Sequence, residues 1–455
     1  MPVGPAHNKP LPAGSKAEQL LWSGPELLMP PLRRQAAELG ILVCDRLRRW
    51  KAMEVALETD ADGTIPSRRS PQLGPGLARG WSGLAVLFEH ADRCRPGEGW
   101  AEEAQGALGR AAQSVAADPS SLAPGLAAGW AGVVFASAFL ARGGQRYGRW
   151  RRELVPHLER SGRSAATAVE NRQGSWPFSD FDHISGLAGL VAGLRSADSI
   201  EVMGAVTSAL VHGTLRGRGG PLWATAPDQI ADEALRVRYR GGLVNLGLAH
   251  GLAGVVAALA LAVRENVAGC DGELALDMVT SSLASAVQWQ GGAPTLPHFL
   301  SLGTESDHGG PGRTAWCYGP PGAARALALA GSVLRRPALV RLADDLLVAS
   351  LAQPENVMRL DSPTFCHGVA GVLQLTTRMA VENADPRIAD LVPRLCTRLL
   401  DTFVPNSVFG FRNAGSGLSR VDEPGLLEGA AGVGLVLLSI AHRPEPSWDQ
   451  AFLLS

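Results

Sequence analysis

The strongest constraint in this sequence is a short pattern that occurs seven times: glycine, two residues, glycine, then an apolar stretch. The first glycines are 49 to 68 residues apart, at Gly80, Gly129, Gly186, Gly251, Gly319, Gly368 and Gly429. A period in this range indicates a repeat architecture, in which neighbouring units share one core. Length alone would allow about three domains. The repeat instead predicts one domain, and it gives a structural reason for many of the 54 glycines.

Longer stretches with one apolar face separate the glycine pairs. In the stretch that starts at Pro386, residues Ile388, Leu391, Leu395 and Leu399 share one face of a helix. Similar stretches cover about 34–58, 100–117, 150–170, 199–214 and 272–290, and another starts at Arg336. An amphipathic helix has one wet face, whereas a helix that is apolar all round is buried.

This alternation predicts an all-α (α/α)7 toroid of seven outer and seven inner helices. The paired glycines would let crowded backbones approach each other and would allow a tight turn into each inner helix. A glycine-rich HEAT-like solenoid is the alternative. A seven-helix membrane protein fits poorly because the apolar runs are too short: Asn245 and His250 interrupt the longest, residues 242–263.

We expect residues 1–33 to form a flexible N-terminal leader without a secretory signal, and residues 34–455 to form the toroid. The interval 215–244, between repeats three and four, has room for a small insertion. Six cysteines without a CxxC pair favour free thiols or metal ligands in a soluble cytoplasmic protein. A net charge of −1 argues against binding to nucleic acid.

Reactive side chains stand just before the glycine pairs of the middle four repeats. If all inner helices begin on one rim, these side chains converge there: Asp182, His250, Cys317, Cys366 and His367. Repeats one, two and seven carry Arg79, Ala128 and Glu428 instead. Cys317, Cys366 and His367 make a Cys₂His set that leaves a fourth tetrahedral position open, as in catalytic zinc sites. The alternative is two buried cysteines and a core histidine.

Two further histidines, His298 and His308, fall in the polar loop from Gly291 to Arg313. Loops of this length without secondary structure tend to be functional, so both are candidates for a substrate contact. The direction of the His183 side chain, beside Asp182, is left open.

With these residues in view, the chain resembles the lanthionine synthetase C-like (LanC) family over about residues 35–445. The matching strings are NLGLAHG, RTAWCYGPPG, FCHGVAG and LLEGAAGVGL. The resemblance implies Zn²⁺ held by Cys317, Cys366 and His367. It also implies an acid/base histidine at His250, with Asp182, Arg313 and Tyr318 around it. Some members carry a small leader-binding insertion, for which 215–244 is the interval with room.

The resemblance further implies a stand-alone lanthipeptide cyclase, which adds peptide cysteine thiolates to dehydroalanine or dehydrobutyrine. Its partners would be a dehydrated precursor peptide with its leader and the pathway dehydratase and transporter. We expect His250 to protonate the enolate and Arg313 to stabilise it, while Asp182 either takes the thiol proton or orients a neighbour. The rivals are an enzyme that adds glutathione to dehydroamino acids, a zinc-thiol alkyltransferase, and a non-catalytic peptide-binding toroid.

Overall fold

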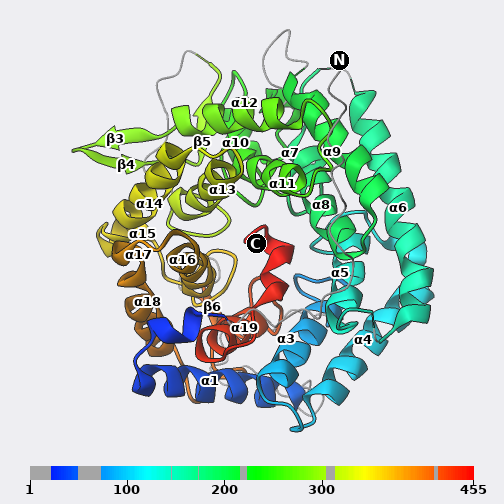
Figure 1. Ribbon diagram of the computed structural model, residues 1–455, viewed down its shortest axis with the longest axis vertical. Coiled ribbons are helices and arrows are strands. Elements are labelled where there is room, and N and C mark those ends of the chain that lie inside the picture. Colours follow the sequence, from blue (N-terminus) through cyan, green and yellow to red (C-terminus); the bar gives the residue numbers. More distant parts are fainter. Residues whose placement is uncertain are drawn as a thin grey trace, which may run out of the picture.

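The computed structural model describes residues 22–49, 73–144, 146–172, 174–215, 223–303, 313–414 and 419–455. These residues form two concentric rings of helices around a common axis (Figure 1). Most of the expected leader, residues 1–21, and the candidate His308 lie outside the described residues.

The inner ring consists of the seven apolar helices that follow the glycine pairs. In the described chain each begins at the residue after the first glycine: α3 (Trp81–Cys94), α5 (Trp130–Leu140), α8 (Leu187–Ser196), α11 (Leu252–Arg264), α13 (Pro320–Val333), α16 (Val369–Asn383) and α19 (Ala430–Ala441). Neighbouring inner helices contact each other, and α19 contacts α3. The ring is therefore closed, which confirms the toroid rather than an open solenoid.

Each outer helix packs on the inner helix that precedes it in the chain. These helices are α4 (Trp100–Ala117), α6 (Gly148–Glu170), α9 (Ile200–Leu215), α12 (Gly272–Ser285), α14 (Pro337–Leu351), and the pair α17 (Pro386–Ala389) and α18 (Leu391–Asp401). The exception is α1 (Pro30–Arg48), which packs on α19 and so covers the last inner helix with the first part of the chain.

Three expected boundaries differ from the structure. Helix α1 begins at Pro30, before the predicted start at residue 34, and Trp22 in the expected leader is already buried. The single helix expected from Pro386 is split at Asp390, because Pro393 lacks an N–H and its ring clashes with the carbonyl of Ala389. The stretch 272–290 ends as strand rather than helix.

Close packing explains the paired glycines. A Cβ on Gly371 would lie 1.9 Å from the carbonyl oxygen of Phe365, and one on Gly132 would lie 2.1 Å from that of Leu126. The same clash with the carbonyl six residues earlier occurs at every second glycine of the seven pairs. Of the first glycines only Gly319 has a positive φ, of +88°. Crowding, rather than a left-handed turn, is therefore the general reason for these glycines.

Short strands occur in the segments that connect the helices. Strands β1 (Ala224–Thr225), β2 (Leu243–Asn245) and β5 (Phe299–Ser301) form one antiparallel sheet; β3 (Gln288–Gln290) pairs with β4 (Ala293–Thr295), and β6 (Asn413–Ala414) with β7 (Arg420–Val421). The described remainder adds α7 (Phe178–Phe181), α10 (Glu233–Arg238), α15 (Glu355–Met358), η1 (Gly24–Leu27), η2 (Pro119–Ser121), η3 (Pro227–Gln229) and η4 (Ser447–Phe452).

The interval 215–244 does carry added structure in its described part. Its strand β1 pairs with β2, and β2 pairs with β5. Strands β4 and β5 come from the loop that we expected to have no secondary structure, so that expectation was wrong for both. Ile230, Tyr239 and Leu243 form a small core there, separate from the main one. Within the described ranges, none of the helices combines the length and the apolar character that crossing a bilayer requires.

Candidate active site

Backbone hydrogen bonds join the entry segments, the residues just before each first glycine, into a ring that we call the glycine rim. The Cys317 N–H donates to the carbonyl of Cys366 at 3.1 Å, and the Cys366 N–H donates to that of Leu427 at 2.8 Å. The Leu427 N–H donates in turn to the carbonyl of Ala78, which links repeat seven to repeat one. Cys317 and Cys366 thus occupy equivalent positions in adjacent repeats, two residues before the first glycine.

The two cysteines form a coupled thiol pair. Cys317 is buried and Cys366 is half-buried. A hydrogen bond between their side chains lowers the pKa of Cys317 and raises the pKa of Cys366, and burial raises the latter further. The nearby guanidinium of Arg313 lowers the pKa of both. Of the two side chains, Cys317 therefore has the lower pKa and accepts the hydrogen bond from Cys366.

His367 and Glu428 extend this cluster. Ligand atoms of Cys366, His367 and Glu428 lie within 4.8 Å of one another. Among the described residues Cys317, the third predicted ligand, is outside this group, and it contacts the group through the hydrogen bond between its side chain and that of Cys366. Glu428 also pairs with Arg79, so the residues before glycine pairs one and seven are in contact. Sequence reasoning placed Glu428 outside the reactive set; its position directly before Gly429, equivalent to that of His367, was the signal that could have found it.

This donor set fits a zinc ion. Thiolates and a neutral imidazole are the ligands that zinc prefers. Burial lowers the pKa of His367, and Arg313 lowers it further, so the ring is neutral at pH 7 and has a lone pair to offer. A hydrogen bond from His367 to Asn413 acts in the other direction and fixes the ring, and Asn413 is itself held by Ser362 at 3.0 Å.

Asp182 and His250 form the second chemical unit of the rim. Asp182 Oδ2 lies 2.6 Å from His250 Nδ1, and its Oδ1 accepts from the N–H groups of Ser185 and Gly186 at 2.7 and 2.9 Å. The Asp182 side chain is 3% exposed and that of His250 is 39% exposed. A buried carboxylate with these three contacts is suited to orient the His250 ring rather than to contact a substrate. His250 Nε2 is then the atom that remains for chemistry.

Asp182 stands four residues before its first glycine, not one, as our reading of the rim had implied. Repeats one, two, four and seven carry glycine at this position, at Gly76, Gly125, Gly247 and Gly425. Those glycines lie directly against the next entry segment; a Cβ on Gly125 would be 2.6 Å from Ser185 Cα. In repeat three this position, next to the entry segment of the following repeat, carries Asp182. Its side chain therefore reaches His250 of repeat four.

Tyr318 is placed beside His250, with ring centroids 6.1 Å apart. Its hydroxyl accepts from Asn245 Nδ2 at 3.0 Å, which leaves the O–H free to donate. Burial raises the pKa of Tyr318 to about 12, so the phenol stays protonated. Asn245 was missed from sequence; its one signal is a polar residue inside an apolar run.

His298 packs against Tyr318 with ring centroids 5.1 Å apart. Its Nε2 accepts the backbone N–H of Arg313 at 2.7 Å, and burial lowers its pKa to about 4. His298 therefore supports Arg313 and Tyr318. The Arg313 guanidinium is directed to the Arg359 carbonyl and the Asp361 carboxylate, at 3.3 and 3.4 Å. All four residues implied as catalytic thus lie on one part of the rim.

Comparison with known proteins shows to which protein family the chain belongs. The family described as "Lanthionine synthetase C-like protein" matches residues 71–453, and the chain belongs to this family. One relative is the nisin biosynthesis protein NisC of Lactococcus lactis subsp. lactis, which is 25% identical over 295 residues. That match covers 60% of this chain and 64% of the relative, less than two thirds of its length.

The fold has a solved counterpart as well. The structure of a nisin cyclase superposes with a TM-score of 0.72 at 19% sequence identity, and the match covers 90% of this chain and 96% of the other. At this identity the likeness establishes the toroid and leaves the chemistry to be argued from the site.

Proposed function

We propose that this protein is a zinc-dependent lanthipeptide cyclase. It adds cysteine thiolates of a dehydrated precursor peptide to dehydroalanine or dehydrobutyrine in the same peptide, which forms lanthionine and methyllanthionine rings. The observation that carries the proposal is the Asp182–His250 pair next to the thiol pair on one rim: Ala249, which precedes His250, donates its N–H to the carbonyl of Cys317 at 3.1 Å. The family and the name of the relative NisC support it.

His250 moves the proton in this proposal. Asp182 holds Nδ1, so Nε2 accepts the proton of the substrate thiol. The sulfur then bonds to the β-carbon, the π electrons of the double bond move toward the substrate carbonyl, and His250 returns the proton to the α-carbon. The net reaction is an addition with no other reactant. Zinc bound by Cys317, Cys366 and His367 would favour the thiolate form of the substrate sulfur.

Two side chains are suited to stabilise the enolate. The Tyr318 hydroxyl has its O–H free, because its oxygen accepts from Asn245, and its high pKa keeps that proton in place. The Arg313 guanidinium adds positive charge, which contributes, together with the larger effect of the hydrogen bond with Cys366, to the lowered pKa of Cys317. Donors fixed in position before the reaction stabilise developing charge most effectively.

The partners follow from the chemistry. The substrate is a precursor peptide that a dehydratase has already treated, and a transporter would take the product out of the cytoplasm, where we place the enzyme. The added structure between β1 and β2 is our candidate for contact with the leader of the peptide.

The decisive experiment is incubation of the purified protein with a dehydrated precursor peptide from its own gene cluster. Each ring should block one cysteine, so alkylation followed by mass measurement should find fewer free thiols. Addition of glutathione without loss of peptide thiols would favour the rival thiol-adding enzyme. Binding without any reaction by the zinc-loaded protein would favour a peptide-binding scaffold.

A further inference from the structure

The chain turns back after α19 and enters the middle of the inner ring, where its C-terminal segment, residues 445–455, lies (Figure 1). Helix η4 in this segment contacts the inner helices α5 and α8. Trp448, Asp449 and Phe452 are at most 3% exposed, as buried as the inner helices. The repeat pattern ends at α19 and gave no hint of this arrangement.

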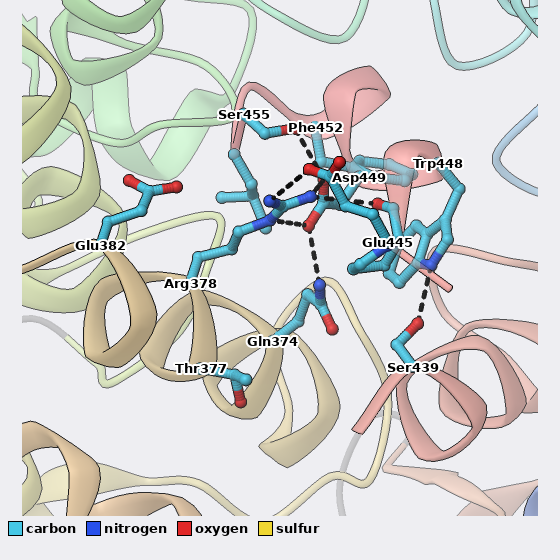
Figure 2. Close-up of polar contacts among 12 residues, drawn as sticks. Gln374, Thr377, Arg378, Glu382, Ser439, Glu445, Trp448, Asp449, Phe452 and Ser455 are labelled. Carbon is cyan, nitrogen blue, oxygen red and sulfur yellow. Dashed lines mark hydrogen bonds and ion pairs between the residues drawn. The ribbon is translucent and has the colours of Figure 1, made fainter. Parts of the chain in front are cut away.

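Polar side chains of the inner ring anchor the segment. Arg378 on α16 donates to both oxygens of Asp449, at 2.7 and 2.8 Å, and to Glu445 at 3.0 Å (Figure 2). Gln374, one turn earlier on α16, donates to Asp449 Oδ2 at 2.7 Å. A buried carboxylate with three such bonds is held in one place, because any movement would leave a charge unpaired.

Other inner helices hold the rest of the segment. Arg325 on α13 donates to the carbonyl of Leu454, and Arg195 on α8 donates to that of Ser455 at 2.8 Å. On the opposite side, Trp448 Nε1 donates to Ser439 Oγ on α19 at 2.9 Å (Figure 2). Helices from four repeats therefore fix the segment relative to the ring.

The anchored segment contacts the residues directly before the two rim cysteines. Trp316 precedes Cys317, and its Nε1 donates to the carbonyl of Phe452 at 3.2 Å. Phe365 precedes Cys366, and its ring lies 4.6 Å from that of Phe452 and 5.7 Å from that of Trp448, between centroids. Trp316 and Phe365 also contact each other, at 5.5 Å.

The rings that contact Phe452 from this position belong to the cysteine-bearing repeats, while His183 of repeat three packs against Trp316. Three residues before the first glycine, repeats one, two, four and seven carry leucine, and repeat three carries His183. Only repeats five and six carry large aromatic rings at this position, and only these repeats carry cysteine next to it. Trp316 and Phe365, each directly before a cysteine, thus both pack against the ring of Phe452.

We propose that the C-terminal segment is a positioning element for the candidate metal ligands, with Phe452 as its central residue. It fixes Trp316 and Phe365 and thereby the separation and direction of the two cysteine sulfurs. This inference rests on the proposed function, since it concerns the same zinc site.

The test compares Phe452→Ala with Phe88→Ala in the full chain. Phe88 is equally buried but stacks on Trp100 of the outer ring, so its loss costs packing away from the cysteines. Zinc affinity is measured by competition with a chelator, and Co²⁺ substitution reports the cobalt–thiolate absorption. We expect Phe452→Ala to weaken zinc binding about 10- to 100-fold and to alter the cobalt spectrum. Phe88→Ala should change neither.

Equal zinc affinity and equal cobalt spectra in the two variants would overturn the inference while leaving the proposed function in place. A wild-type chain that binds no zinc would overturn both. If circular dichroism shows that Phe452→Ala is unfolded, Trp316→Phe carries the test. That variant keeps a ring but loses the bond to the Phe452 carbonyl, so weaker zinc binding is expected and unchanged binding contradicts the inference.

Discussion

Two parts of the glycine rim share one backbone and differ in chemistry. Before the first glycine, repeats one and two carry small or aliphatic residues and Arg79, whereas repeats five and six carry residues 316–318 and 365–367. Yet Ala78 donates to the Ala127 carbonyl at 2.9 Å much as Cys317 donates to that of Cys366 at 3.1 Å. The backbone of the rim is therefore the same with many different side chains. The candidate site arises from the particular residues that repeats five and six carry on this common backbone frame.

The largest effect is expected from Cys366→Ala. Alanine already occupies the equivalent position in repeats one and two, at Ala78 and Ala127, so the frame should fold. Zinc should fall from about one per chain to background, and ring formation should be lost with it. Metal analysis and thiol counting on the same sample measure both. Retained zinc would show that the ligand set is wrong.

Asp182→Asn removes the orienting carboxylate and leaves the thiol pair untouched. The amide can donate to His250 Nδ1, which would favour the wrong tautomer and take Nε2 out of proton transfer. We expect the cyclisation rate to fall about 10²- to 10⁴-fold with zinc content unchanged. A rate within a few fold of wild type would remove the Asp182–His250 pair from the mechanism.

The shared frame predicts equal losses of stability in its two parts. Gly132→Ala and Gly371→Ala would each force a Cβ against a backbone carbonyl, although only Gly371 lies near the candidate site. We expect each to lower the free energy of unfolding by about 2–4 kcal/mol in denaturant titrations. Gly109→Ala, on the outer helix α4 with open space around it, should instead raise it by up to about 1 kcal/mol. A tolerated Gly132→Ala would mean that the two parts are not equivalent.

A smaller effect is expected on the pH dependence of stability, and it comes from repeat one, which carries none of the candidate site residues. Burial lowers the pKa of His90 on α3 to about 3, while the unfolded chain has a histidine pKa of about 6.5. Between these values only the unfolded state takes up the proton, so stability falls as pH falls, by about 1.4 kcal/mol per pH unit. Unfolding at pH 7, 6 and 5 should give a shallower slope for His90→Gln. Identical slopes would contradict a neutral buried His90.

Sequence reasoning found the helices well because their signals are local. All seven inner helices begin where the glycine pairs predicted, and the outer helices begin near their expected starts. Sequence reasoning failed for elements that pack against a segment far away in the chain. The pairing of β2 with β5 and the contact of α1 with α19 depend on segments far apart in the chain, and no local pattern announces them.

For the candidate site, the sequence predicted most of the residues but not the contacts between their side chains. Sequence placed Cys317, Cys366, His367 and His250 near one another through the repeat. It left the role of Asp182 open, and the 2.6 Å contact with His250, together with burial, now favours orientation over proton transfer from the thiol. Glu428 and Asn245 were not predicted; contacts between neighbouring repeats bring Glu428 to Cys366 and His367, and Asn245 to Tyr318.

The sequence by itself determined seven buried helices that alternate with amphipathic ones, and the contact of α19 with α3 in the structure decided that they close into a toroid. Glycine is required at the start of each inner helix because the neighbouring backbone leaves no room for a Cβ, and these glycines can be recognised in the sequence one by one. Only the tertiary structure decided what fills the middle of the ring. The C-terminal segment reaches Trp316 and Phe365 because Arg378, Arg325 and Arg195 converge on it from separate helices. Such convergence depends on the closed ring as a whole, since no single segment of the chain encodes it.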